Sequence, residues 1–238
     1  MFTSLKTRSE EAELLDDLLC KGEEVDQNLR ELETINKWLG GDYVTIEGIE
    51  KILGGKEVKD KIITIADLGC GGGDMLIKVA KWAKRKNLKV RLIGIDANPY
   101  IVNYARRNAS AFKEIEFLAL DIFSEEFKKL KFDIITSTLF THHFTDQSLV
   151  QLYQQLDRQS SLGIITNDIH RHFLAYHSIN LLTRLFSKSY MVKNDAGLSV
   201  KRAFRLSELK DILTKAGIDN YNISWKWAFR WQIIIKKN

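Results

Sequence analysis

Glycines and acids are concentrated in one short stretch of the 238-residue chain, IITIADLGCGGGDM at positions 62–75. An apolar, β-branched run leads into a turn that holds Gly69, Gly71, Gly72 and Gly73, and a pattern typical of a helix follows. Glycine accepts positive φ and lets a backbone approach a ligand closely, while a helix N-terminus offers unpaired N–H donors. The stretch therefore predicts a strand, a ligand-binding turn and a helix.

Two acids flank this turn, Asp67 at the strand end and Asp74 at the helix start. Their charges favour a ligand with a positive group over a bare pyrophosphate. S-adenosylmethionine, which carries an ammonium and a sulfonium, meets that requirement. The dinucleotide fingerprint does not fit because Asp74 stands where it needs glycine, and the Gly-Lys-Ser/Thr of a P-loop is missing. A glycine-rich surface turn without a ligand is the remaining alternative.

Further acids follow the next two predicted strands. The strand over 90–95 ends at Asp96, and the strand over 115–120 ends at Asp121. Ligands of open α/β sheets bind at the carboxyl ends of the strands, so these acids are expected to meet Asp67 at one edge. A carboxylate at the tip of the second strand can accept both hydroxyls of a ribose. Asp96 is therefore the predicted ribose ligand.

The segments DLGCGGGD, IGIDAN and FDIITSTL resemble the first, second and fourth motifs of class I S-adenosylmethionine-dependent methyltransferases. The resemblance implies an α/β fold, a Rossmann-like doubly wound sheet of seven strands that is mostly parallel with an antiparallel last strand. It also implies S-adenosylmethionine as cofactor and places Asp121 near the adenine amino group. Ile122 and Phe123 are expected either to sandwich the purine or to pack in the core. The expected cofactor-binding residues are Asp67, Gly69, Gly71, Gly73, Asp96, Ala97, Asp121, Ile122 and Thr138.

Four of the five histidines follow the predicted fourth and fifth strands, over 132–139 and 162–169. Methyl transfer needs a nucleophile held in line and, for a phenol or enol, a group that removes its proton. His143 and His170 are the two candidates for the catalytic base, and Asp168 is expected to orient His170. Alternatively, the His142–His143 pair is architectural. The spacings do not support a metal site among the histidines, so none is predicted.

Helices are expected on either side of this core. Leucine spacing predicts two amphipathic helices between residues 9 and 39 and a third over 44–53, which together form an N-terminal cap over 1–59. The methyltransferase domain is expected over 60–238, with a helical insertion at about 170–190 whose helix runs over 173–186. These helices either shape the substrate pocket or only pack. A basic loop (Lys193, Lys201, Arg202, Arg205) is expected to bind an acidic group or stay solvated, and Ser207 is expected to cap the last helix before a strand pair over 221–235.

Composition limits the partners. Lys and Arg number 36 against 31 Asp and Glu, a net charge of +5, without the basic stripe typical of nucleic-acid binding. Two cysteines, no signal peptide and no membrane-spanning run indicate a cytoplasmic protein. The stretches LRELETINKWLGG, DIHRHFLAY and LSVKRAFR are similar to small bacterial methyltransferases of polyketide and quinone biosynthesis. This implies O- or C-methylation of a small lipophilic phenolic, quinol or polyketide-type substrate. An RNA or protein methyltransferase and a non-catalytic cofactor-binding protein are the alternatives.

Overall fold

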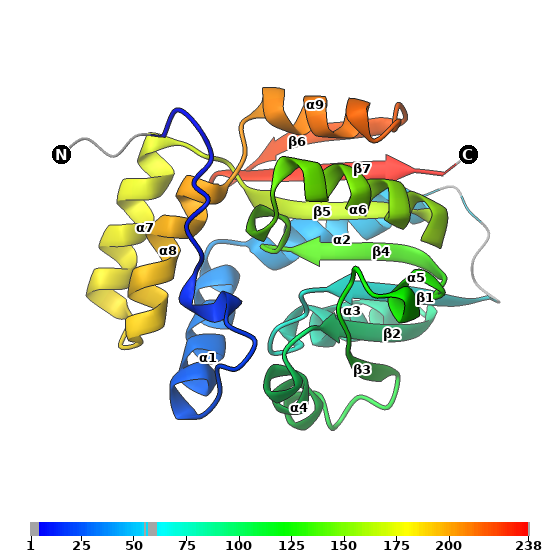
Figure 1. The fold of residues 1–238 in the computed structure, drawn as a ribbon. Helices are drawn as coiled ribbons and strands as arrows, with labels where there is room; N and C mark the ends of the chain where they lie inside the picture. Colours follow the sequence, from blue (N-terminus) through cyan, green and yellow to red (C-terminus); the bar gives the residue numbers. More distant parts are fainter. Residues whose placement is uncertain (1–4, 55, 57–60, 238) are drawn as a thin grey trace.

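A seven-stranded mixed sheet forms the centre of the molecule, in a computed structural model that describes residues 5–54, 56 and 61–237. The strand order is β3-β2-β1-β4-β5-β7-β6, and β7 runs antiparallel to both of its neighbours (Figure 1). This confirms the predicted Rossmann-like sheet. The strands are β1 (Ile62–Leu68), β2 (Lys89–Asp96), β3 (Ile115–Ala119), β4 (Phe132–Thr138), β5 (Ser160–Ile169), β6 (Tyr221–Lys226) and β7 (Arg230–Lys236).

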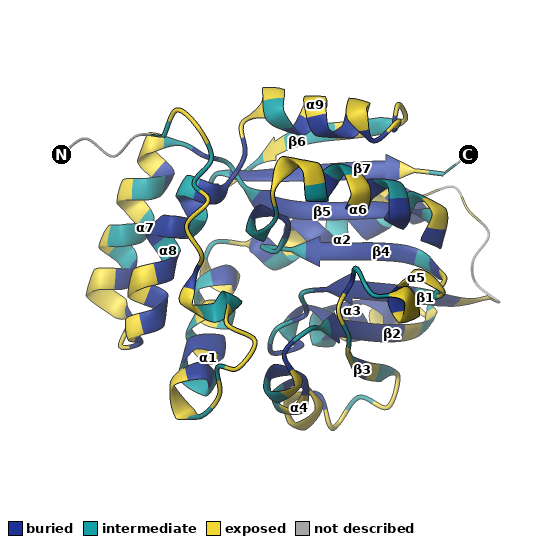
Figure 2. Ribbon diagram, viewed as in Figure 1, coloured by how far each residue is buried: buried dark blue, intermediate teal, exposed yellow. Residues whose placement is uncertain are grey.

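Helices cover both faces of this sheet. α2 (Gly41–Leu53), α3 (Asp74–Arg85) and α4 (Pro99–Asn108) pack on one face, and α5 (Glu125–Lys128), α6 (Asp146–Gln159) and α9 (Leu206–Lys215) pack on the other. The central strands are consequently buried on both sides, which explains their nearly continuous apolar runs (Figure 2). Ile65, for example, is fully buried opposite Leu92 and Ile134 of the neighbouring strands. Burial of such a side chain stabilises the fold by about 1.5–3 kcal/mol.

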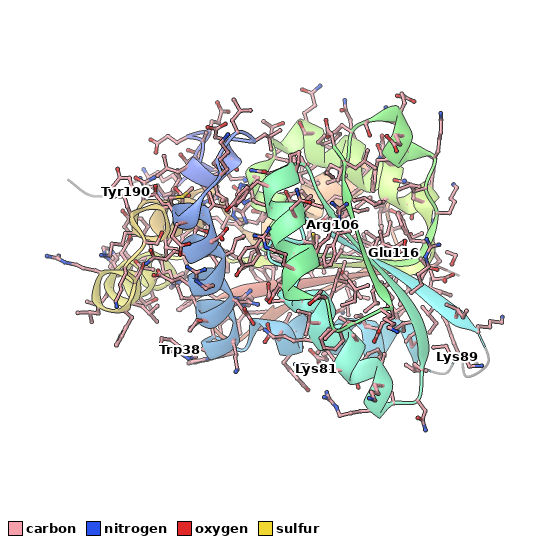
Figure 3. All side chains as sticks on the ribbon, turned by 90° about the horizontal axis from the view of Figure 1, so that it is seen from below. Trp38, Lys81, Lys89, Arg106, Glu116 and Tyr190 are labelled. Atoms are coloured by element: carbon pink, nitrogen blue, oxygen red, sulfur yellow. The ribbon has the colours of Figure 1, made fainter. Side chains whose placement is uncertain are left out.

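A third group of segments lies beyond the carboxyl ends of the parallel strands. It consists of residues 5–20, here called the N-terminal strap, with α1 (Glu23–Trp38), α7 (Phe173–Phe186) and α8 (Tyr190–Arg202). Val25 and Leu29 of α1 pack against Ile101 of α4 and Met191 of α8. Figure 3 shows α1 beside α4, with Trp38 at the C-terminal end of α1. These segments close the strand-tip side of the molecule.

The N-terminal strap corrects one prediction from the sequence. Two helices were expected between residues 9 and 39, but only α1 forms, and the strap contains a single short turn, η1 (Leu14–Asp16). Its backbone donors bind distant partners: Ser9 N–H donates to the carbonyl of Lys201 at 3.0 Å, and Leu14 N–H donates to Asp195 at 3.0 Å. Leu19 is 84% exposed rather than part of an apolar stripe. Tertiary hydrogen bonds have replaced those of a helix here.

The predicted basic loop is also wrong. Residues 190–202 form α8, and Arg202 at its end is buried. Arg205, not Ser207, caps α9, where its N–H donates to Glu208 at 2.7 Å. Other boundaries agree: α7 spans the expected residues, and Asn98 caps α4 by accepting from Tyr100 N–H at 2.8 Å.

The expected domain boundary at residues 59 and 60 lies outside the described residues. On its N-terminal side, α2 packs in the helical layer against β5 and β7, whereas the strap and α1 lie over the strand tips. In the described part of the chain, no helix combines the length and apolar character that a membrane crossing requires.

Candidate active site

One cavity of about 940 Å³ lies at the carboxyl ends of the parallel strands. We distinguish two of its walls. The glycine-turn wall comprises the residues that line the cavity within 67–74, 96–98 and 121–122. The helical wall comprises the lining residues of the N-terminal strap, α1, α7, α8 and residues 225–229, together with the His142–His143 pair. This volume is at the upper end of ordinary ligand pockets. The cavity can therefore hold a cofactor together with a substrate.

The glycine turn is shaped by tight packing. Gly69 has φ +62°, and a Cβ atom there would come within 2.1 Å of the Phe140 ring. Gly71, at φ +49°, is less crowded, because an added Cβ would make only an ordinary van der Waals contact with Leu29 at 3.7 Å. The turn thus exposes bare backbone to the cavity just before α3 begins at Asp74.

Buried acids surround this turn. Burial, and then the charges of Asp74 and Asp96, raise the pKa of Asp67 to about 7, although Thr136 donates to it at 2.7 Å. Burial likewise raises the pKa of Asp74 to about 6, and Lys78 offsets this only in part from 3.7 Å. Burial disfavours the ionised form of both acids, and the charge of a cationic ligand would restore that form. The two acids therefore fit a cationic ligand. The ammonium and sulfonium of S-adenosylmethionine meet this condition.

Asp96 has the geometry expected of a ribose ligand. Its Oδ2 accepts from Gly71 N–H at 3.2 Å and its Oδ1 from Asn98 N–H at 3.0 Å. Each carboxylate oxygen has a second lone pair free for a further hydroxyl donor. The two backbone bonds hold the carboxylate in place while it faces the cavity.

All predicted cofactor residues line the cavity except Gly73. These residues are Asp67, Gly69, Gly71, Asp96, Ala97, Asp121, Ile122 and Thr138. Gly73 instead caps α3 in a left-handed conformation, with φ 76°. Their individual contacts with the cofactor stay predictions.

His142 lies between two carboxylates. Its Nδ1 is 2.7 Å from Asp168 Oδ1, and its Nε2 is 3.5 Å from Glu13 Oε1. Burial lowers the pKa of His142, but the Asp168 and Glu13 carboxylates outweigh that effect and raise it to about 10. Thr141 also donates to Asp168, at 2.5 Å, so the carboxylate is fixed from several sides.

His143 stands beside it, with ring centroids 4.3 Å apart, and also lines the cavity. Its Nδ1 is 2.5 Å from Asp16 of the strap. Arg202 donates to Asp16 at 2.7 Å and to the carbonyl of His143 at 2.5 Å. The guanidinium therefore ties the strap to the histidine pair.

His170 lies elsewhere. It borders a second, smaller cavity with His172, and its ring centroid is 4.7 Å from that of Trp231. Burial, together with nearby cationic groups, lowers the pKa of His170. Asp168 orients His142 and not His170, so that expected pairing is wrong. The histidine that the structure brings to the main cavity with His143 is His142.

Glu13, Asp16 and Arg202 are the site residues that sequence reasoning missed as a cluster. Glu13 and Asp16 belong to a segment expected to be a plain amphipathic helix, and Arg202 was expected in a loop. The alternation of acids with leucines in the strap offered no signal for this role. One carboxylate oxygen of Glu13 and one nitrogen each of His142 and His143 lie within 4.8 Å of one another, which is a group that could hold a metal ion.

The rest of the helical wall is mostly apolar. Leucines of the strap and α1 line it together with aliphatic side chains of α7, and aromatic residues from the end of β6 and from the turn that follows complete the lining. The residues are Leu15, Leu18, Leu32, Leu39, Ile179, Leu182, Trp225, Trp227 and Phe229. This compartment suits an apolar ligand.

Comparison with known proteins agrees with this geometry. The family described as "Methyltransferase domain" matches residues 59–217. Carboxy-S-adenosyl-L-methionine synthase of Staphylococcus epidermidis is 24% identical over 197 residues, which cover 78% of this chain and 83% of that protein. The enzyme of the same name from Wolinella succinogenes is 26% identical over 183 residues, 73% of this chain and 75% of that protein.

Solved structures share the fold. The plantazolicin methyltransferase BpumL in complex with SAH has a TM-score of 0.63 at 19% identity, with coverage of 90% of this chain and 89% of that chain. A SAM-dependent methyltransferase from Aquifex aeolicus has a TM-score of 0.61 at 18% identity, with coverage of 87% and 96%. The chain thus belongs to the methyltransferase domain family, and it is a class I enzyme whose cofactor is S-adenosylmethionine.

Proposed function

We propose that this methyltransferase acts on oxygen or carbon of a small lipophilic phenolic, quinol or polyketide-type substrate. The observation that carries the proposal is the apolar helical wall, where Leu18, Leu32, Ile179 and Leu182 enclose the compartment beyond the strand tips. An apolar cavity with a few polar groups at one side is the form that a lipophilic substrate with one reactive group requires. Glu13, His142 and His143 supply those polar groups.

The glycine-turn wall is the proposed cofactor site. Asp67 and Asp74 favour the cationic groups, Gly69 and Gly71 allow close approach, and Asp96 accepts the ribose hydroxyls. Ala97, Asp121 and Ile122 are assigned to the adenosine side, and Thr138 to the methyl-bearing end. When bound, S-adenosylmethionine supplies a methyl group whose carbon–sulfur bond breaks as the substrate nucleophile bonds to the carbon, leaving S-adenosylhomocysteine.

His143 is the proposed catalytic residue. Asp16 engages its Nδ1, so its Nε2 is the nitrogen left to act on a nucleophile in the cavity. Arg202 is a positioning residue because it fixes both Asp16 and the His143 backbone. His170 is not carried into this proposal, because it borders the other cavity.

A second candidate function follows from the relatives named carboxy-S-adenosyl-L-methionine synthase. By that name, the product of those enzymes is a carboxylated form of S-adenosylmethionine itself. Arg230 lines the cavity, is only 3% exposed, and has an Nε atom with no hydrogen-bond partner among the described residues. A carboxylate-bearing small acid, acting as carboxyl donor, would supply that partner. This activity would convert S-adenosylmethionine to a carboxylated cofactor and methylate nothing.

Mass spectrometry of the reaction products distinguishes the two functions. The full chain would be incubated with S-adenosylmethionine that carries a trideuterated methyl group, in one series with alkylphenols, hydroquinones and β-keto thioesters and in parallel series with RNA, with protein and with small carboxylic acids. Appearance of a labelled methyl group on one of these classes supports the first function. A labelled methyl group found only on RNA or protein, or a cofactor that gains a carboxyl group, would contradict it.

A further inference from the structure

We propose that Glu13, His142 and His143 bind a divalent transition-metal ion of the zinc type at the inner end of the substrate compartment. One potential ligand atom from each residue lies within 4.8 Å of the other two. Two imidazoles with one carboxylate form a ligand set that zinc and iron enzymes use when coordination positions are left open. All three residues line the main cavity, so the open positions face it.

The partners of the two rings point to the same role. Metal-binding histidines usually donate their other ring N–H to a carboxylate, which fixes the ring and raises the basicity of the ligating nitrogen. His142 Nδ1 is 2.7 Å from Asp168, and His143 Nδ1 is 2.5 Å from Asp16. Each ring is thus supported by its own carboxylate, and each keeps one nitrogen for an ion.

The state of Glu13 is a second, independent observation. Its side chain is 6% exposed, and its Oε1 has no hydrogen-bond partner within the described part of the chain. His142 Nε2 lies 3.5 Å from it, which is an ion pair when the ring is protonated but leaves this buried oxygen without a hydrogen bond from the described residues, and a buried acceptor without one is costly. A metal ion between Glu13 and the two rings would satisfy this oxygen directly.

Charge in the cluster supports the same conclusion. Glu13, Asp16 and Asp168 contribute three carboxylates around the two rings, and Arg202 is the guanidinium that binds one of them. Without an ion, His142 carries the proton that its two carboxylates favour, and metal binding would release that proton. With both imidazoles then neutral, two negative charges are left over. A divalent cation balances them.

Binding of the ion does not depend on the proposed function. Only the part that the ion would play in the reaction rests on it. A phenol or enol oxygen that enters the compartment would occupy an open position on the ion, which holds it and favours loss of its proton to water. His143 would then act on the nucleophile as a ligand of the ion. Histidine ligation favours a transition metal over Mg²⁺ or Ca²⁺, which prefer oxygen ligands.

Titration of the metal-stripped full-length protein with Zn²⁺ tests the proposal without any substrate. Glu13→Gln and His143→Ala each remove a ligand, while His170→Ala is the matched control because it removes a histidine outside the cluster. Calorimetry should show one Zn²⁺ per chain in the wild type and in His170→Ala, with affinity lower by about tenfold or more in both other variants. S-adenosylhomocysteine binding checks that each variant is folded.

A wild type without stoichiometric Zn²⁺ binding, or a folded Glu13→Gln or His143→Ala variant with wild-type affinity, would overturn the proposal. If a variant does not fold, Co²⁺ added to the wild type decides instead: a site of nitrogen and oxygen ligands gives visible absorption bands, and their absence refutes the site. The proposed function fails separately, when no lipophilic substrate is methylated by either the metal-loaded or the metal-free protein. Full-rate methylation by metal-free protein would preserve the function and refute the catalytic role of the ion.

Discussion

The two walls of the cavity are built in different ways. The glycine-turn wall consists of short motifs, each at the end of one strand, and the parallel register of β1, β2 and β3 brings them together. In the helical wall, α7 and α8 are joined to the N-terminal strap through long-range contacts, such as the Arg202–Asp16 pair, 186 residues apart. The comparison suggests that cofactor binding depends on local sequence, whereas substrate binding depends on tertiary assembly. The predictions below separate these two dependences.

The largest effect is expected at His143. His143→Ala should lower turnover by about 10² to 10⁴-fold, because the side chain that acts on the nucleophile is lost. Affinity for S-adenosylhomocysteine should stay unchanged, since His143 belongs to the other wall. Turnover and calorimetry would be measured beside His170→Ala as control. A His143→Ala variant that keeps the wild-type rate, as His170→Ala should, would show that His143 does not act on the substrate.

Removal of the N-terminal strap is expected to have the next largest effect. A chain that lacks residues 1–20 loses Glu13 and Asp16 and opens the compartment to water, so turnover should fall by about 10²-fold through misplaced groups. Asp67 and Asp96 remain in place and Asn98 loses only its bonds to Cys20, so cofactor affinity should change much less than turnover. If cofactor affinity and turnover fall together by the same factor, the two walls are not independent.

Asp96→Ala tests the glycine-turn wall. Loss of a charged acceptor for the ribose should weaken cofactor binding by about 1.5–3 kcal/mol. Calorimetry with S-adenosylmethionine would measure this effect. Glu116→Ala is the control, because Glu116 lies on β3 in an exposed ion pair with Arg91, away from the cavity (Figure 3). A folded Asp96→Ala variant with normal affinity would refute the ribose assignment.

A smaller effect is expected from pH. In the folded protein the pKa of Asp67 is raised from 3.8 to about 7. Protonation of Asp67 therefore stabilises the unliganded fold, and this stabilisation is lost as the pH rises through about 7. A cationic ligand needs the ionised carboxylate, and its affinity should therefore rise up to about tenfold between pH 6 and pH 7.5. Titrations at both pH values would measure the change. The same rise in Asp67→Asn would assign it to another group.

The sequence was sufficient to predict the sheet, the helix of the insertion and nearly all of the cavity residues at the strand tips. Those features depend on apolar runs and on turns that are readable within a few residues, as around Gly69 and Asp96. The conformation of the strap was not predictable. The spacing of its leucines is typical of a helix, but the N–H groups of Leu14 and Leu15 donate to the distant Asp195 instead. Asp168 was assigned to the wrong histidine because alternation along β5 shows where it points but not that η2 (Thr141–His143) presents His142 to it.

The hydrogen bond from Leu14 to Asp195, which spans 181 residues, also affects the order in which the protein can be completed during synthesis. The strap leaves the ribosome before α8, which supplies acceptors for its N–H groups. During translation the sheet can begin to form while the strap still lacks its partners. The helical wall therefore cannot close before α8 has been synthesised, and a nascent chain paused before residue 190 would carry the glycine turn without a finished substrate compartment.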